Sequence, residues 1–92
     1  MLYFEWDPTK ATSNLHKHSV SFKEASSIFA DSLSYTFNDP ANSYDETRLL
    51  TIGLASTRKL LIVSHTECQG KIRIISARKL TKKEREFYER GY

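Results

Sequence analysis

The second half of the chain contains the feature that most limits the possible folds, because three β-type runs follow one another almost without interruption. The runs cover residues 48–56, 59–67 and 71–78, and only two or three residues separate one run from the next. A parallel crossover needs about a dozen residues, whereas a hairpin turn needs about two to five. Consecutive runs are therefore predicted to pair as an antiparallel meander.

The start of the chain predicts a strand followed by a helix. The aromatic run at residues 2–6 is short and has the composition of a strand. It ends at Asp7 and Pro8, an N-cap residue followed by a residue that fits the first helical position. The helix is predicted to continue to about Lys17.

A second helix and a further strand are predicted before the meander. Ser21 and Glu24 have the spacing of a capping box, and the helix that they begin is predicted to end near Ala30. Apolar residues alternate with polar ones over residues 33–37, which is typical of a strand with one buried face. The polar segment 39–46 contains turn-forming residues and is predicted to be a loop.

The last predicted helix carries a capping signal at each end. Thr81 and Glu84 have capping-box spacing, and Gly91 is available to end the helix. The element order is then β-α-α-β-β-β-β-α, an α+β fold with helices packed on a mainly antiparallel sheet. A chain of 92 residues with 39% hydrophobic content can bury one modest core, so residues 1–92 are predicted to form a single domain.

Composition narrows the class of protein. The apolar runs are too short to cross a bilayer and the first residues lack a signal-peptide pattern, so a cytoplasmic protein without a membrane partner is predicted. Residues 1–43 have three basic and five acidic side chains, whereas residues 44–92 have eleven basic and six acidic ones. This asymmetry suggests a polyanionic partner, although basic surface residues also serve solubility.

Cationic side chains occur within the strand predicted at residues 71–78. Alternation predicts one apolar and one mixed face. The first consists of Ile72, Ile74 and Ser76, and the second of Lys71, Arg73, Ile75 and Ala77. Arg73 is then either an arginine whose stem covers the edge of the core or a group directed at a phosphate.

Arg78 lies where this strand gives way to the last helix. Lys82 and Lys83 follow at the start of that helix, whose first backbone N–H groups also favour anions. Together these groups are predicted to reach one anion. The alternative is an ordinary solvated helix start.

Histidine and acidic residues supply the candidates for proton transfer. His65 and Glu67 are two residues apart on one strand, where they form either a proton-transfer pair or a structural histidine with an unrelated carboxylate. His16 and His18 lack the i, i+4 spacing of a helical metal pair, and Cys68 is the only cysteine. No metal site is predicted.

The chain lacks the motifs of the common hydrolases. It contains neither a Gly-x-Ser-x-Gly elbow nor a glycine-rich phosphate loop. RNA, however, supplies its own nucleophile in the 2′-hydroxyl. A small protein can cleave it by positioning the backbone, stabilising the phosphate with Arg and Lys, and moving two protons. The side chains present meet that requirement, and a nucleic-acid-binding domain without enzyme activity is the alternative.

The ordered set of short motifs resembles the BrnT family of type II toxins over nearly the whole chain. The most specific motifs are Phe-Glu-Trp-Asp at 4–7, Asn14 with Lys17-His18, Ile-Ile-Ser-Ala-Arg at 74–78, and Glu84-Arg85 with Tyr88. The resemblance implies a RelE-like fold and a ribonuclease that cleaves RNA, expected to be messenger RNA, without a metal or other cofactor. It also implies a BrnA-type antitoxin, which would inhibit the toxin and bind operator DNA as a complex.

The resemblance further implies which side chains cleave RNA. Arg73 and Arg78 are expected to stabilise the phosphate and the transition state, with His65, Glu67 and Tyr88 as further catalytic candidates. The side chains expected to bind the substrate are basic: Lys17, His18, Lys71, Lys82 and Lys83.

Two positions depart from the family's pattern. Ser19 stands where glycine is usual, and Cys68 stands where arginine is expected after His-Thr-Glu. The missing arginine would weaken RNA binding or turnover if residue 68 lies at the site. A catalytically weak toxin that acts mainly through complex formation and operator repression is therefore a further alternative.

Overall fold

The computed structural model describes residues 1–39, 41 and 47–91, and it confirms the predicted α+β class and order of elements. The elements are β1 (Phe4–Trp6), α1 (Pro8–His18), α2 (Phe22–Ser26), the 3-10 turn η1 (Ser27–Ala30), β2 (Tyr35–Asn38), β3 (Leu49–Leu54), β4 (Leu60–Cys68), β5 (Lys71–Lys79) and α3 (Lys82–Arg90). Most of the loop predicted at 39–46 lies outside the described residues. No helix in the described ranges is long and apolar enough to cross a membrane.

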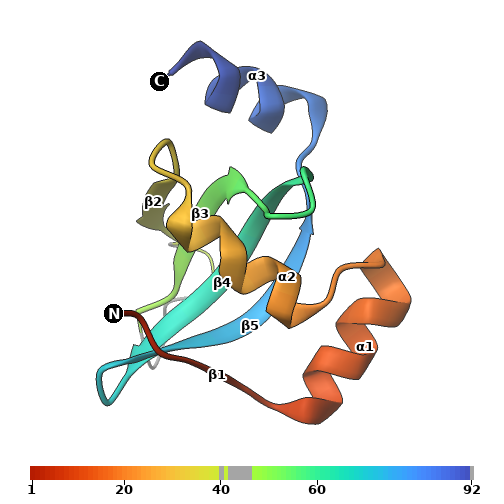
Figure 1. Cartoon of the computed structure of the whole chain (residues 1–92), viewed down its shortest axis with the longest axis vertical. Coiled ribbons are helices and arrows are strands. Elements are labelled where there is room, and N and C mark those ends of the chain that lie inside the picture. Colours follow the sequence, from red (N-terminus) through yellow and green to blue (C-terminus); the bar gives the residue numbers. More distant parts are fainter. Residues whose placement is uncertain (40, 42–46, 92) are drawn as a thin grey trace.

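The strands form one sheet in the order β1-β5-β4-β3-β2. Strands β3 to β5 are the predicted antiparallel meander, and β2 pairs antiparallel with β3. The exception is β1, which pairs in parallel with β5 from Phe4 opposite Ile72 to Trp6 opposite Ile74. As Figure 1 shows, α2 lies across one face of the sheet, while α3 stands beyond the end at which β5 finishes.

Local capping explains where the helices begin and end. The Asp7 carboxylate accepts a hydrogen bond from the N–H of Thr9 at 2.7 Å, and Pro8 occupies the first helical position as predicted. Ser19 ends α1 with a φ of 57°, in the left-handed region. Glycine adopts that conformation at lower cost, so the backbone at this position is one that favours glycine.

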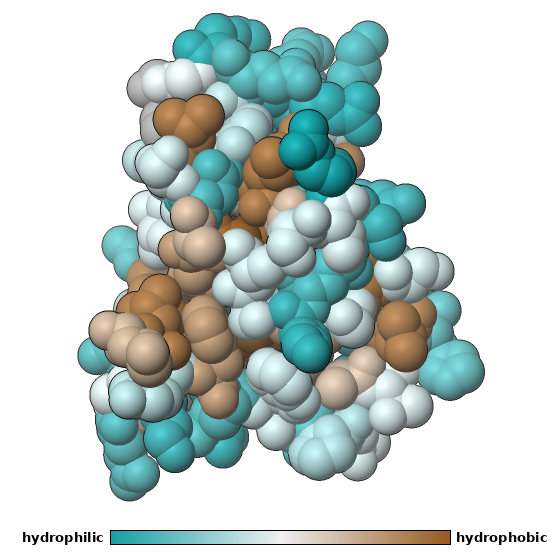
Figure 2. Space-filling model, viewed as in Figure 1, coloured by the Kyte–Doolittle hydropathy of each residue, from teal (hydrophilic) through white to brown (hydrophobic). Residues whose placement is uncertain are grey.

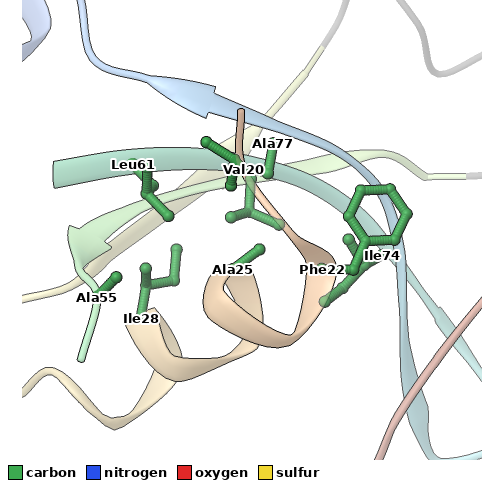
Figure 3. Packing of buried hydrophobic residues seen from close by; sticks show 9 residues of the cluster. Val20, Phe22, Ala25, Ile28, Ala55, Leu61, Ile74 and Ala77 are labelled. Atoms are coloured by element: carbon green, nitrogen blue, oxygen red, sulfur yellow. The ribbon is translucent and has the colours of Figure 1, made fainter. Parts of the chain in front are cut away.

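The main core lies between the sheet and the helices that cover it. Figure 3 shows Phe22, Ala25 and Ile28 against Leu61 and Ile74 of the central strands. On the other face a smaller cluster joins Ile52, Ile62 and Leu80, with Tyr88 of α3 packed against it. Helix α3 has no buried residue, and its surface at the top of Figure 2 is mainly hydrophilic.

A register irregularity in the β4–β5 pairing changes the faces predicted for the last strand. Ser64 pairs with Ser76 and the next residue, His65, pairs with Ile74, so Ile75 is left out of the register. Alternation therefore restarts after Ile75, and Ala77 joins Ile74 in the main core. The prediction that these two residues face opposite sides was wrong. Ser76 and Arg78 point to the face that α1 and α2 leave open.

The buried amide of Asn14 holds α1 against β5. Its Nδ2 donates to the carbonyl oxygens of Val20 and Ala77, each at 2.9 Å, and its Oδ1 accepts from the N–H of Ala77 at 3.0 Å. Because the side chain is only 5% exposed, water does not replace these bonds when the amide is removed. The position of α1 relative to Arg78 thus depends on one side chain.

We expect Asn14→Leu to destabilise the protein by about 3 kcal/mol, because it leaves buried backbone groups of Val20 and Ala77 unsatisfied. The free energy of unfolding is measured by urea denaturation. Thr12→Ala is the matched control, since this exposed hydroxyl of the same helix bonds only to the carbonyl of Pro8. Equal stability of the two variants would contradict the role given to Asn14.

Candidate active site

Polar side chains from five parts of the chain line a cavity of about 460 Å³ on the open face of the sheet. We call it the Arg78 cavity. Its polar lining is His18, Asp39, Ser64, Ser76, Arg78 and Glu84. Its apolar lining includes Phe37, Leu50 and Ile62. The pairing of β4 with β5 places Ile62 opposite Arg78 and Ser64 opposite Ser76. The two serines therefore form the next cross-strand pair on the same face of the sheet as Arg78.

A two-point ion pair fixes the Arg78 guanidinium. Nη1 donates to Oε1 of Glu84 at 2.8 Å and Nη2 donates to Oε2 at 3.0 Å, while Nη1 also donates to the carbonyl of Lys79. The hydrogen bond from Arg78 lowers the pKa of Glu84, and the same bond raises the pKa of Arg78. Both groups are therefore charged at neutral pH, and the plane of the guanidinium is held in place.

Glu84 has a second function at the start of α3. Its Oε1 accepts the N–H of Thr81 at 2.9 Å, and the Thr81 hydroxyl accepts the N–H of Glu84 at 3.2 Å. This is the predicted capping box, now complete. One carboxylate thus connects the helix start to Arg78 at the end of β5.

The C-terminal end of α1 brings two more basic residues to this region. His18 lines the Arg78 cavity, and a neighbouring hollow of about 200 Å³ is lined by Lys17, His18 and Ser76 among others. Sixty residues separate His18 from Arg78 in the sequence, so only the packing of α1 on β5 brings them together. The structure groups these three predicted residues, Lys17, His18 and Arg78, in one place.

An apolar cavity of about 450 Å³ adjoins the Arg78 cavity and shares Phe37 and Glu84 with it. Lys83 of α3 lies at its edge, among Tyr35, Phe37 and Phe87. The Tyr35 ring lies 5.8 Å from the Phe37 ring and 5.7 Å from the Phe87 ring, measured between centroids. Lys82 is exposed one residue earlier. Of the two lysines, Lys83 thus lines the cavity that shares Glu84 with the Arg78 cavity.

Other predicted residues lie at the opposite end of β5. Arg73 is five residues before Arg78, roughly 16 Å along an extended strand, and its Nε donates to Glu5 of β1 at 3.0 Å. Lys71 lies farther still, opposite Cys68 at the β4–β5 hairpin, and Glu67 is exposed nearby. One phosphate cannot contact both arginines. Cys68, the departure from the family's pattern, is therefore remote from the Arg78 cavity.

His65 lies in the interior, on the face of the sheet that the helices cover. It is 4% exposed, its Nε2 is 2.7 Å from the hydroxyl of Thr51, and the Phe29 ring lies edge-on at 5.0 Å. The Thr51 hydroxyl also bonds to the hydroxyl of Thr36 at 2.7 Å. Burial lowers the pKa of His65 to about 4. The imidazole is therefore neutral at neutral pH and is separated from the Arg78 cavity by the sheet.

Tyr88 attaches α3 to the rest of the molecule. Its hydroxyl donates to Oδ2 of Asp31 at 2.6 Å, and the same carboxylate accepts the N–H groups of Leu33 and Leu54. Burial alone would raise the pKa of Asp31, but these three hydrogen bonds outweigh burial and lower it. This geometry gives Tyr88 a role in positioning the helix.

Sequence reasoning missed Asp39 and gave no role to the two serines of the cavity. A signal for the serines exists, because Ser64 and Ser76 interrupt two apolar runs and lie opposite each other across the β4–β5 hairpin. Recognising that pair requires the correct register, which the irregularity at His65 hides. No group of three or more His, Cys, Asp or Glu suited to a metal ion occurs among the described residues.

The stability of the protein should fall between neutral pH and about pH 5 because of His65. The unfolded chain binds a proton near pH 6.5, whereas the folded chain binds it only near pH 4. The stabilising effect is thus complete above pH 6.5 and declines as the pH falls toward 4, by about 2 kcal/mol at pH 5. Urea denaturation at the two pH values measures the decline.

His65→Gln is the variant that tests this assignment, because glutamine retains hydrogen bonding to Thr51 without a proton to gain. The exposed His16 and His18 remain in both proteins, so their effects cancel in the comparison. We expect the variant to lose most of the pH dependence over this range. An undiminished dependence would show that groups other than His65 cause it.

Comparisons with known proteins agree with this architecture. A family model described as "Ribonuclease toxin, BrnT, of type II toxin-antitoxin system" matches residues 6–84. The 1.1 Å crystal structure of the Brucella abortus ribonuclease toxin BrnT matches with a TM-score of 0.69 and 20% sequence identity, over 89% of this chain and 100% of that chain. No curated protein matches significantly. Because the family model extends over most of the sequence, the chain belongs to the BrnT family of type II ribonuclease toxins.

Proposed function

We propose that the chain is an RNA-cleaving toxin whose reaction takes place in the Arg78 cavity. The observation that carries the proposal is the convergence of Arg78, His18 and two serine hydroxyls in one open cavity. Lys17 and Lys83 line the hollows that adjoin it, and Lys82 precedes Lys83 at the exposed start of α3. A phosphate in this cavity meets a fixed guanidinium and mobile ammonium groups, which suits a phosphoryl group that gains charge in the transition state.

The proposed reaction uses a nucleophile from the RNA itself. The 2′-hydroxyl gives up its proton to a base while its oxygen attacks the adjacent phosphorus, the bond from phosphorus to the 5′-oxygen breaks, and the 5′-oxygen takes up a proton from an acid. The products are a 2′,3′-cyclic phosphate and a free 5′-hydroxyl, and no step requires a metal ion. Arg78 would stabilise the phosphate, with Glu84 acting as the residue that positions it.

His18 is the proposed proton-transfer group in place of His65. His18 is exposed and lines the cavity, whereas His65 is buried on the other side of the sheet. A general acid or base must come within hydrogen-bond reach of the group whose proton it moves. Position therefore favours His18 as the proton-transfer group. Arg73 and Glu67 lie toward the β4–β5 hairpin, too far from the Arg78 cavity to take part in the same step.

A protein antitoxin is the second part of the proposal. A type II toxin acts with an antitoxin, and we propose a BrnA-type protein that inhibits this chain and binds the operator of the gene pair as a complex. The open face of the sheet supports a protein partner, since Tyr35 and Phe87 are 39% and 40% exposed beside the basic cavity. Covering this surface would bury aromatic side chains and block RNA at once.

A specific observation also favours a weaker enzyme. Arg78 is the only one of the five predicted catalytic side chains, all of them described by the structure, that lines the cavity, and Glu84 balances its charge. A toxin with little turnover, acting mainly through complex formation and operator repression, is therefore the alternative. A nucleic-acid-binding domain that does not cleave its ligand is a second alternative. Measurement of cleavage by the purified chain separates them.

Arg78→Ala should reduce cleavage of a single-stranded RNA about a hundredfold or more, because it removes a preorganised charge at the phosphate. Arg73→Ala is the matched control, since it removes the same group from the same strand roughly 16 Å away and should have a much smaller effect. Rates are measured with purified, antitoxin-free protein, and melting curves confirm that both variants fold.

Two results would contradict this assignment. Equal loss of cleavage in both arginine variants would mean that the reaction is not centred on the Arg78 cavity. Loss of wild-type activity in EDTA, restored by a divalent ion, would mean that a metal takes part in the reaction. We expect EDTA to leave the rate unchanged.

Co-expression with the protein encoded by the neighbouring gene should raise the melting temperature and suppress growth inhibition. Binding to the folded state alone stabilises it by about 4 kcal/mol at a thousandfold excess of ligand over Kd. Differential scanning fluorimetry of the free chain and the purified complex measures the shift. A complex that fails to form, or that leaves both properties unchanged, would refute the toxin-antitoxin pair.

A further inference from the structure

A second concentration of positive charge lies at the same end of the sheet but outside the Arg78 cavity. Cationic side chains from three elements line a hollow of about 290 Å³. We call it the Arg58 hollow. It is lined by Arg58 and Lys59 of the β3–β4 turn, Leu60, Lys79 at the end of β5, Leu80, and Arg85 of α3. None of its four cations was among the residues predicted to bind RNA.

The charges in this hollow are poorly balanced. Among the described residues, its lining contains four cations and no carboxylate. Lys59 has a counter-ion in Glu24, at 3.4 Å from Nζ to Oε2, whereas Arg58, Lys79 and Arg85 are exposed. Like charges that converge on a concave surface repel one another and raise the local concentration of anions. An anion in the hollow would relieve this repulsion.

The backbone of the β3–β4 turn gives Arg58 no structural advantage. Its φ is 72°, in the left-handed region, where a side-chain-bearing residue is less stable than glycine by about 1 kcal/mol. The turn itself is closed by backbone bonds, from the N–H of Ala55 to the carbonyl of Lys59 and from the N–H of Arg58 to the carbonyl of Ala55. The guanidinium is therefore not needed to form the turn, and its contribution lies in its charge.

In the part of the chain that the structure describes, the hollow shares no lining residue with the Arg78 cavity, and Lys79 points to the opposite face of β5 from Arg78, so the two hollows lie on either side of the end of this strand. Lys79 follows Arg78 on β5, and Arg85 follows Glu84 on α3, so each element contributes one residue to the cavity and the next to the hollow. We propose that the Arg58 hollow binds the sugar-phosphate backbone of single-stranded RNA that flanks the phosphate held by Arg78. This inference rests on the proposed function and extends it from one phosphate to a longer segment of RNA.

A phosphate backbone fits this hollow better than an acidic protein segment does. Arginine forks match phosphate oxygens, and long flexible lysines follow a repeating anion without reading its bases. RNA held at Arg78 must also leave the cavity past its neighbours, whereas a protein partner has no such requirement. The hollow would thus add affinity for long RNA without adding sequence preference.

The test compares Arg58→Gln, Lys79→Gln and Arg85→Gln, alone and combined, with Arg90→Gln as the control. Arg90 is an exposed cation on the same helix as Arg85 and lies outside the hollow. The probes are a long single-stranded RNA and a short oligonucleotide that spans only the cleaved bond. Both carry 2′-O-methyl groups for the binding measurements, so that the nucleophile is blocked without altering the protein.

We expect the combined variant to reduce the slope of log K against log salt by about 2, because each phosphate that a cation neutralises on a single strand adds about 0.7 to that slope. Affinity for the long RNA should fall about tenfold or more, whereas binding and cleavage of the short oligonucleotide stay unchanged. Arg90→Gln should alter none of these. Arg58→Gly provides a variant that removes the charge and relaxes the backbone, so its effect on binding cannot come from unfolding.

The outcomes separate this inference from the proposed function. An unchanged salt slope in the combined variant, together with RNA cleavage by the wild type, would overturn the inference about the Arg58 hollow and leave the proposed function standing. A reduced slope without any cleavage by the wild type would support the hollow and refute the ribonuclease assignment. Unchanged RNA binding with a weakened antitoxin complex would overturn the inference in favour of a protein contact.

Discussion

The arrangement of the open site depends on the contact between the Asn14 amide and the backbone of Ala77. Strand β1 pairs with β5 only as far as Ile74, so within the described ranges the outer edge of β5 has no neighbouring strand beyond that point. Asn14 supplies both a donor and an acceptor to Ala77 and takes the place of the missing strand. Without this side chain, the backbone N–H and carbonyl of Ala77 at the edge of β5 would lack hydrogen-bond partners within the protein.

This contact has a direct effect on the chemistry of the site. Lys17 and His18 are about one helical turn beyond Asn14, so fixing the amide at Ala77 places the end of α1 beside Ser76. Residue 77 in turn precedes Arg78. A single buried amide therefore sets the position of groups from both ends of the sequence, and the cavity between them exists only in the folded chain.

Local signals in the sequence were sufficient for most of the fold. Asp7 with Pro8, and Thr81 with Glu84, identify helix starts because caps act within a few residues. The short turns identify the meander for the same reason. The parallel pairing of Phe4–Trp6 with β5 was not foreseen, because it joins segments about seventy residues apart and no local pattern encodes it.

The candidate site was harder to predict, because the sequence of these strands does not show which side chains point to which face of the sheet. The run at 60–63 is apolar on both faces, since α1 and α2 cover one face and α3 partly covers the other. The register shift that leaves Ile75 unpaired then changes which side chains of β5 point to which face of the sheet. Arg78 was predicted from its charge at the strand end and His18 from the family resemblance, and both line one cavity in the structure. His65 was named without any sign that it is buried.

Helix α3 has no buried residue, and polar contacts together with the packing of Tyr88 against the smaller cluster hold it beside the Arg78 cavity. The helix is attached through Glu84 to Arg78 and through Tyr88 to Asp31, with Leu80 in the small cluster before it. Ion pairs of partly exposed groups are weak and are screened by salt. Glu84 borders both cavities, and because its carboxylate accepts hydrogen bonds from both Arg78 and Thr81, it links the guanidinium to the helix start. In the proposed function, the binding of RNA at Arg78 and the position of α3 are therefore coupled through one carboxylate. Arg85 of the same helix extends this coupling to the Arg58 hollow.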